Sequence, residues 1–272
     1  MTIQKFLKLS TSNLEQAGIG TARLDSLVLL EDATGRDRAY LLAHAEAVLQ
    51  GATLKKLEGL VKRRMRHEPL AFIRGKTEFY GREFIINKDV LEPRPESETM
   101  IGLLLELSAK SKGLRIVDVG TGSGALAITA KLELPKNEVI ATDIDPKCLA
   151  VARQNANKYK VDIQFFQGNL FVPISAHSTH LTALLCNLPY VPDDYKINLA
   201  AAMEPRQAIF GGKDGLDLYR QLFDKINRGD VRVQYVFTES LPLQHNGLES
   251  IARKAGFKLQ KSDDFIQMFV AN

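Results

Sequence analysis

The sequence predicts a small helical bundle followed by an open, doubly wound α/β domain with a mostly parallel sheet. Three observations support this fold class. Helical periodicity with few strand signals fills residues 1–67, an apolar connector that closes with Pro93 and Pro95 spans residues 68–98, and short apolar runs alternate with helical stretches over residues 99–272. Strands that alternate with crossover helices are typical of a parallel sheet. At 272 residues the chain is long enough for two domains.

Residues 1–67 contain apolar stripes at helical spacing, separated by short polar breaks. Several short helices in series predict a helical bundle. The stripes are formed by Ile3, Phe6 and Leu7, by Leu24, Leu27, Val28 and Leu30, by Tyr40, Leu41, Leu42 and His44, and by Leu54, Leu57, Leu60 and Val61.

The positive charge is uneven. The net charge is +4, and residues 1–70 hold 11 Lys/Arg against 8 Asp/Glu. Much of the excess is one run, formed by Lys62, Arg63, Arg64 and Arg66. Such a run is more often a solvated helix face than a contact for an acidic or nucleic-acid-bearing partner. The balance is too mild to require nucleic acid.

The composition excludes several classes of protein. With 45% hydrophobic and 25% charged residues, the chain is ordinary for a globular protein. No apolar run approaches the ~20 residues that span a bilayer, and the N-terminus lacks the apolar core of a secretory signal. Cys148 and Cys186 have no partner at metal-ligand spacing, so neither a disulfide framework nor a metal site is expected. We therefore expect a cytoplasmic protein.

The connector and the second half predict a hairpin and then a seven-stranded sheet. Apolar residues around Gly81 favour a small hairpin, and Pro93 and Pro95 forbid a continuous helix after it. After Gly256 only two aspartates separate the last two strand-like runs, so the last strand is predicted to be antiparallel to its neighbour. The earlier strands are predicted at 115–119, 138–142, 163–167, 182–187 and 233–238, with helices such as 146–160 and 215–226 between them.

The strongest local signal is VDVGTGSGALAI, residues 117–128, where a strand is followed by three glycines and a helix of small residues. Glycines allow a tight turn and close approach of a ligand, and a helix start offers N–H groups to an electron-rich ligand end. The third glycine, and the acid two residues before the first, favour S-adenosylmethionine over a dinucleotide. The loop residues predicted to bind the cofactor are Asp118, Gly120, Thr121, Gly122, Ser123 and Gly124.

The next predicted strand ends in VIATDIDP, residues 139–146. A carboxylate at its tip, Asp143, can accept both hydroxyls of a ribose. Asp145 followed by Pro146 is typical of an N-cap with proline at the first helical position, so Asp145 is predicted to be structural. The glycine loop and Asp143 together predict a site for an adenosine cofactor.

A third segment, LLCNLPYVP (184–192), is predicted at the carboxyl end of a strand, beside the cofactor. Asn187-Leu188-Pro189-Tyr190 matches the turn of enzymes that methylate planar NH₂ groups. The side-chain oxygen of Asn187 and the main-chain carbonyl of Leu188 can each accept one of the two N–H bonds. This directs the nitrogen toward the sulfonium methyl and stabilises its developing charge. Pro189 stiffens the turn, and Tyr190 offers a ring for a flat group.

With these motifs the chain resembles the release-factor glutamine methyltransferases (HemK/PrmC) over most of its length. The resemblance implies a Rossmann-like class I methyltransferase domain that uses S-adenosylmethionine and releases S-adenosylhomocysteine. It further implies methyl transfer to the side-chain amide nitrogen (N5) of the glutamine in the Gly-Gly-Gln motif of class I peptide chain release factors. The helical domain would dock on that factor. The matching segments are residues 22–44, 68–98 (especially Leu91 to Glu98) and 207–222, with Glu239 at the end of the fifth strand.

Three features depart from the family pattern. Leu188 replaces the usual proline, and ribosomal RNA adenine dimethyltransferases also use Asn-Leu-Pro-Tyr. Asn169 stands where the family commonly has an acid, but asparagine can still accept from an adenine amino group. The resemblance implies that Asn169, Leu170 and also Asn187 bind the cofactor. The closing Gly-x-x-Arg of the family is absent from DDFIQMFVAN.

Other functions are compatible with the same motifs. The Leu188 variant and the basic run favour an adenine-N6 methyltransferase acting on RNA or DNA as the nearest alternative. A module that binds cofactor and partner without turnover, and a nicotinamide dehydrogenase, are weaker alternatives. For the leading function we expect a release factor as protein substrate, no membrane, no stable nucleic-acid partner, no metal, and a monomer.

Overall fold

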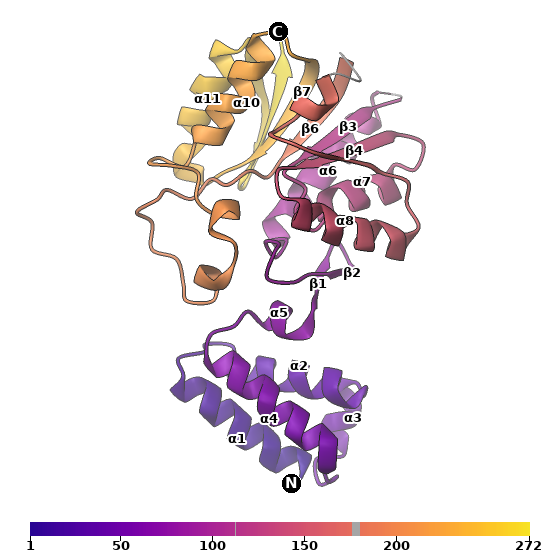
Figure 1. The fold of residues 1–272 in the computed structure, drawn as a ribbon, viewed down its shortest axis with the longest axis vertical. Coiled ribbons are helices and arrows are strands. Elements are labelled where there is room, and N and C mark those ends of the chain that lie inside the picture. The colour runs from indigo at the N-terminus through magenta and orange to yellow at the C-terminus, as the bar shows by residue number, and fades with distance from the viewer. Residues whose placement is uncertain (112, 176–179) are drawn as a thin grey trace. The chain divides into compact units, whose positions relative to one another are not determined.

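The computed structural model describes residues 1–111, 113–175 and 180–272, and the chain divides into two compact units. One unit contains Met1–Gly75 and Asn198–Met203, and the other contains Lys76–Ile197 and Glu204–Asn272. The first is helical and the second is an α/β unit (Figure 1). Within the described ranges, no helix is long and apolar enough to cross a membrane.

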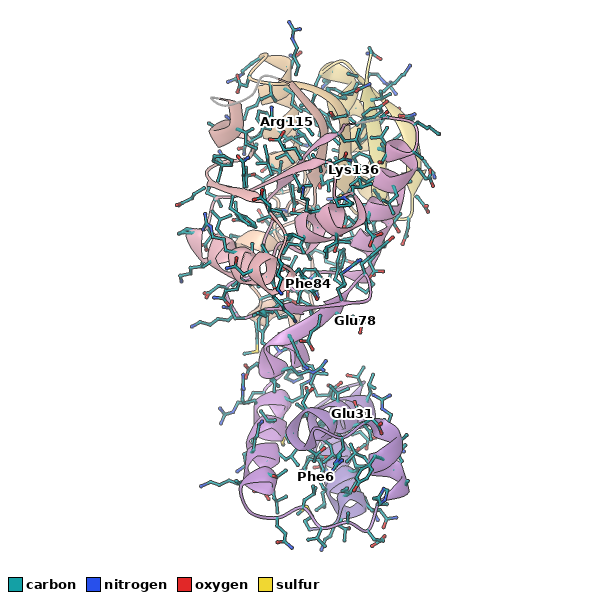
Figure 2. All side chains as sticks on the ribbon, turned by 90° about the vertical axis from the view of Figure 1, so that its right-hand side faces the viewer. Phe6, Glu31, Glu78, Phe84, Arg115 and Lys136 are labelled. Atoms are coloured by element: carbon teal, nitrogen blue, oxygen red, sulfur yellow. The ribbon has the colours of Figure 1, made fainter. Side chains whose placement is uncertain are left out.

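Residues 1–75 form five short helices around one apolar core, as the periodicity predicted. Phe6 lies inside this bundle (Figure 2). Four members of the predicted stripes are exposed instead of buried: Leu24, Tyr40, Leu42 and His44. The helices are α1 (Ile3–Gln16), α2 (Ala22–Thr34), α3 (Arg38–Ala43), α4 (Gly51–Met65) and α5 (Leu70–Arg74).

The basic run at the end of α4 is partly internal. Arg64 is buried, and its Nε lies 2.6 Å from Oδ2 of Asp25 on α2. Arg63 forms a bidentate ion pair with Glu68. The prediction of a solvated helix face was therefore wrong for Arg64. Its charge is removed from water and is paired with the carboxylate of Asp25. Lys62 and Arg66 remain exposed.

The predicted hairpin is confirmed and belongs to the α/β unit. Strands β1 (Lys76–Phe79) and β2 (Arg82–Ile85) pair antiparallel. The two residues between them, Tyr80 and Gly81, have φ of 52° and 67°, as a tight two-residue hairpin turn requires. Phe84 packs into the core of the α/β unit (Figure 2).

Asn155, on α8 (Pro146–Tyr159), joins the hairpin to the glycine loop. Its Oδ1 accepts the backbone N–H of Ile85 at 2.7 Å. Its Nδ2 donates to the carbonyl oxygens of Ile85 and Ser123, each at 2.9 Å. Because Asn155 is fully buried, these bonds are shielded from water and fix the connector against the loop.

The large unit is built on a seven-stranded sheet of order β5-β4-β3-β6-β7-β9-β8. Strands β3 to β7 are parallel, and β9 pairs antiparallel with both β7 and β8, which confirms the predicted terminal hairpin. The strands are β3 (Arg115–Val119), β4 (Glu138–Asp143), β5 (Gln164–Gln167), β6 (His180–Cys186), β7 (Arg232–Glu239), β8 (Phe257–Asp263) and β9 (Ile266–Ala271).

Both faces of the sheet are buried, as the apolar strands require. Along β3, Ile116 belongs to one core cluster and Val117 to the other. One face packs against α6 (Glu98–Ser108), α7 (Ala125–Glu133) and α8, and the other against α10 (Asp217–Asn227) and α11 (His245–Lys254) (Figure 1). A short helix, α9 (Val172–Ser175), follows β5.

The sheet places the predicted motifs at one edge. The parallel strands β3, β4, β6 and β7 all end there. From the neighbours β3 and β6 the chain continues toward opposite ends of the sheet. In open α/β sheets a crevice forms outside the strand ends at such a switch point. A ligand site is therefore expected above β3 and β6.

Candidate functional site

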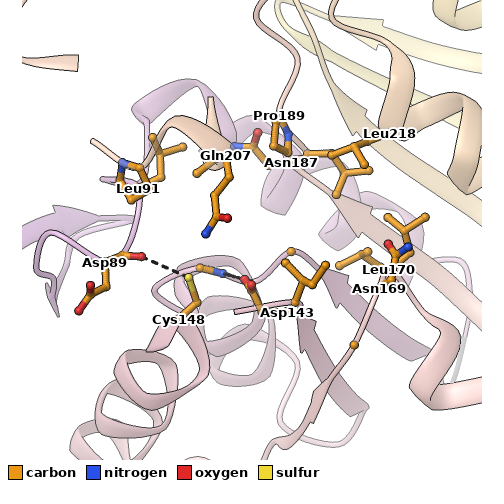
Figure 3. A pocket seen from close by; sticks show the side chains of 18 residues that line it. Asp89, Leu91, Asp143, Cys148, Asn169, Leu170, Asn187, Pro189, Gln207 and Leu218 are labelled. Atoms are coloured by element: carbon orange, nitrogen blue, oxygen red, sulfur yellow. Dashed lines mark hydrogen bonds between the residues drawn. The ribbon is translucent and has the colours of Figure 1, made fainter. Parts of the chain in front are cut away.

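A cavity lies at this edge of the sheet (Figure 3). It brings together most of the residues that the sequence predicted. Those that line it are Gly120, Gly122, Asp143, Asn169, Leu170, Asn187, Leu188 and Pro189. The other predicted residues are outside its lining: Asp118, Thr121, Ser123, Gly124 and Tyr190.

The glycine loop is held by hydrogen bonds to the end of β4. The backbone N–H groups of Gly120 and Thr121 both donate to the carbonyl of Thr142 at 2.9 Å. Gly124 has φ of 82°, and a Cβ there would lie 3.1 Å from Cβ of Ala152 on α8. The third glycine therefore permits the close approach of α8 to the loop.

Asp118 supports the loop from behind. It is 1% exposed, and its Oδ2 accepts from Oγ1 of Thr121 at 2.6 Å and from the N–H of Ala127 at 3.1 Å. Burial raises the pKa of this carboxyl to about 7, against the opposing effect of the two hydrogen bonds. Asp118 thus shapes the turn from inside the protein.

Asp143 faces the cavity from the tip of β4 (Figure 3). Its Oδ2 accepts the N–H of Gly122 and its Oδ1 accepts the N–H of Asp145, each at 2.9 Å. Each carboxylate oxygen can accept a further hydrogen bond. Burial raises the pKa of Asp143. Asp145 accepts the N–H of Lys147 at the start of α8, which confirms its predicted role as N-cap.

The Asn187–Tyr190 turn is supported by the segment 207–216. The N–H of Val191 donates to the carbonyl of Ile209 at 3.0 Å, and the N–H of Gly211 donates to Val191 at 2.9 Å. A Cβ on Gly211 would clash with the carbonyl oxygen of Pro189. The turn is thus packed backbone against backbone, which only glycine allows at this spacing.

Four polar side chains form a hydrogen-bonded network beside the cavity. Asn187 donates from Nδ2 to Oγ of Ser97 at 2.9 Å. Ser97 donates to Oε2 of Glu239 at 2.5 Å, and the hydroxyl of Tyr190 donates to Oε1 at 3.0 Å. Burial raises the pKa of Glu239, and burial beside Glu239 raises the pKa of Tyr190. Tyr190 therefore joins the network through its hydroxyl and lies outside the cavity lining.

Several cavity residues were not predicted as site residues. Asp89 and Leu91 come from the connector, Cys148 from α8, and Gln207 from η3 (Arg206–Ala208) (Figure 3). Burial raises the pKa of the Cys148 thiol to about 12, so it stays protonated. The similarity of segments 68–98 and 207–222 to the family could have identified Asp89, Leu91 and Gln207 as site residues. Ser97, inside the first segment, was also missed.

Within ranges 1–111, 113–175 and 180–272, no group of three or more His, Cys, Asp or Glu side chains could hold an ion. The polar side chains at the cavity are two carboxylates, three amides and one thiol, from Asp89, Asp143, Asn169, Asn187, Gln207 and Cys148. Such groups suit binding and orientation of hydrogen-bonding ligands.

The fold and the site define a Rossmann-like class I methyltransferase. Residues 5–75 match the family model of the PrmC N-terminal domain, and residues 99–204 match that of the methyltransferase small domain. The chain belongs to the release factor glutamine methyltransferase family. It is 35% identical over 219 residues to the release factor glutamine methyltransferase of Vibrio cholerae, covering 79% of this chain and 76% of that protein.

A relative from another organism belongs to the same family. The release factor glutamine methyltransferase of Bacillus subtilis is 35% identical over 232 residues, covering 83% of this chain and 80% of that protein. Among solved structures, the hMettl16 catalytic domain in complex with an RNA hairpin superposes with a TM-score of 0.54 at 14% identity, covering 80% of this chain and 81% of that one. At that identity the likeness concerns the fold alone.

Proposed function

We propose that this protein transfers a methyl group from S-adenosylmethionine to the side-chain amide nitrogen of the glutamine in the Gly-Gly-Gln motif of a class I peptide chain release factor. One observation carries the proposal. The amide of Asn187, the carboxylate of Asp143 and the glycine loop line one cavity. Family membership supports the same substrate.

The cavity fits S-adenosylmethionine. Asp143 has acceptor capacity beyond its two backbone bonds and suits the ribose hydroxyls. Asn169 and Leu170 line the same cavity and suit the adenine ring, with the amide accepting from the adenine amino group. A Cβ on Gly120 would lie 3.3 Å from Leu188, so glycine keeps this wall of the cavity open. The bound cofactor supplies an electrophilic methyl group on sulfur.

Asn187 and Leu188 orient the acceptor. An amide nitrogen is a poor nucleophile because its lone pair is delocalised. Oδ1 of Asn187 and the carbonyl oxygen of Leu188 each accept one N–H of the substrate amide, which aims the nitrogen at the methyl group and stabilises the positive charge that develops. Holding both reactants in line contributes several kcal/mol of the ~7–11 kcal/mol available from orientation.

The helical unit serves as the docking region for the rest of the factor. One glutamine in a cleft offers little contact area, whereas stable protein recognition usually buries ~1,200–2,000 Å². The exposed cations Lys62 and Arg66 suit an acidic surface on the partner. The enzyme acts on the factor as a monomer.

Methyl-labelled S-adenosylmethionine tests the acceptor class. The purified protein is incubated with a class I release factor, with the same factor carrying alanine in place of the Gly-Gly-Gln glutamine, and with structured RNA. We expect label in the first reaction only. Label in RNA and in neither protein would assign the activity to an adenine-N6 methyltransferase instead.

A further inference from the structure

A chain of hydrogen bonds leads away from the cavity into the protein. Its members are Asn187, Ser97, Glu239 and Tyr190, drawn from the turn after β6, from η1 (Pro95–Ser97) and from the end of β7. Ser97 and Glu239 are 2% and 0% exposed, so water does not compete for their bonds. Asn187 is the member that lines the cavity.

The donors and acceptors in this chain have a fixed order. Glu239 accepts at both of its oxygens, from Ser97 at Oε2 and from Tyr190 at Oε1, so the single hydroxyl proton of Ser97 is used in the bond to Oε2. Oγ of Ser97 can then only accept from Asn187, and it does so from Nδ2 at 2.9 Å. The amide therefore presents its nitrogen to Ser97 and keeps Oδ1 for another donor.

The opposite orientation of the amide is unfavourable. Rotation by 180° would place Oδ1 of Asn187 against Oγ of Ser97, whose proton is already committed, so two acceptors would face each other. It would also turn the N–H groups of Asn187 toward the acceptor, where an oxygen is needed. The hydrogen bond from Tyr190 to Oε1 occupies the second oxygen of Glu239 and holds that carboxylate in place.

We propose that Ser97, aimed by Glu239, is a positioning residue that fixes the Asn187 amide with its oxygen toward the acceptor nitrogen. This inference rests on the proposed function for its catalytic consequence. The orientation of the amide itself is a property of the protein alone. The two parts are therefore tested separately.

The first test is nuclear magnetic resonance of the protein labelled with ¹⁵N at asparagine. The Asn187 side-chain signal is identified by its loss in Asn187→Ala. We expect one Nδ2 proton to exchange slowly with water in the wild type and in Ser97→Thr, which keeps a hydroxyl. In Ser97→Ala that protection should fall, because the amide keeps only its interaction with Glu239. An unchanged Asn187 signal in Ser97→Ala overturns the positioning role, whatever the substrate is.

The second test is steady-state methylation of a class I release factor. Ser97→Ala should lower kcat by roughly 10- to 100-fold, as a misplaced catalytic group does, with an unchanged Kd for S-adenosylmethionine. Ser97→Thr should restore most of kcat. The matched control is Thr129→Val, which removes a buried hydroxyl that has no partner in the described part of the chain; it should leave kcat unaltered.

A second variant tests the proposal if Ser97→Ala fails to fold. Glu239→Gln keeps the side-chain shape but can donate to Ser97, so the direction of the chain is no longer fixed. It should lower both kcat and the protection of the Asn187 amide. Lost protection with normal kcat overturns the catalytic part of the proposal. Lost protection in a protein whose wild type methylates no release factor refutes the proposed function and leaves the positioning intact.

Discussion

Two carboxylates of the glycine-loop region, Asp118 and Asp143, differ in what they contact. Asp143 lines the cavity, whereas Asp118 is enclosed by Thr121 and the start of α7. Both were predicted to bind the cofactor, because spacing from the glycines identifies the strand tips but not the side of the loop on which a side chain lies. We now propose direct binding for Asp143 and support of the loop for Asp118.

Replacement of Asp143 by alanine should weaken cofactor binding by ~1.5–3 kcal/mol, the range for hydrogen bonds to a charged group. Calorimetric titration with S-adenosylmethionine measures this. Asp145→Ala is the matched control, because Asp145 caps α8 and is outside the cavity lining. It should lower the free energy of unfolding by about 1 kcal/mol with little change in affinity. Equal affinities for wild type and Asp143→Ala would remove Asp143 from the site.

The buried carboxyl of Asp118 should make the free energy of unfolding depend on pH. Its pKa rises from 3.8 to about 7 on folding. As pH rises through this interval, the unfolded chain releases the proton while the folded protein still holds it, so the free energy of unfolding falls. Asp118→Asn removes this contribution. Urea unfolding at pH 4 and pH 7 should therefore show the variant gaining stability relative to wild type as pH rises. Parallel pH profiles would contradict the assignment.

The hydrogen-bonded network around Ser97 could not be predicted from the spacing of residues along the sequence. Asn187 was predicted because its neighbours form a recognisable turn. Ser97 lies 90 positions earlier in the chain, and its bond to Asn187 exists only once the connector has folded over the end of the sheet. A buried network of this kind is tertiary, so no local pattern reports it.

Among the elements, the segment 207–216 has no room for a side chain at position 211. A Cβ on Gly211 would clash with Pro189, beside Asn187. Gly211→Ala should therefore displace the turn and lower kcat by roughly 100-fold, since a shift of ~1 Å at a catalytic group has that cost. Gly102→Ala is the control: Gly102 is inside α6 with open space around it. It should stabilise the helix slightly. If Gly211→Ala and Gly102→Ala methylate a release factor with the same kcat, the segment 207–216 does not support the Asn187–Tyr190 turn.

Local patterns also explain which elements were predictable. The strand runs, the helix start at Pro146 and the Tyr80–Gly81 hairpin follow from periodicity, capping and turn chemistry, and all were confirmed. The insertion of β9 between β7 and β8 was not predicted, because strand order depends on pairing between distant segments. The burial of Arg64 was missed for the same reason: its partner Asp25 is 39 residues away.

For the whole molecule, the helical unit is the part that the methyltransferase fold does not require. Removing residues 1–75 should depress methylation of an intact release factor far more than methylation of a short Gly-Gly-Gln peptide. Rates for both substrates with both enzymes measure this. Lys62→Glu combined with Arg66→Glu should slow association with the factor, and the effect should fade at high salt. Equal losses for factor and peptide would exclude a docking role.

The central claim is methyl transfer to a glutamine amide by the site around Asn187. Mass spectrometry of a class I release factor after incubation with S-adenosylmethionine and the enzyme tests it most directly. We expect a single added methyl group on the side chain of the Gly-Gly-Gln glutamine, and none with Asn187→Ala, although that variant still binds the cofactor. A methyl group on any other residue, or an equal yield with Asn187→Ala, would contradict it.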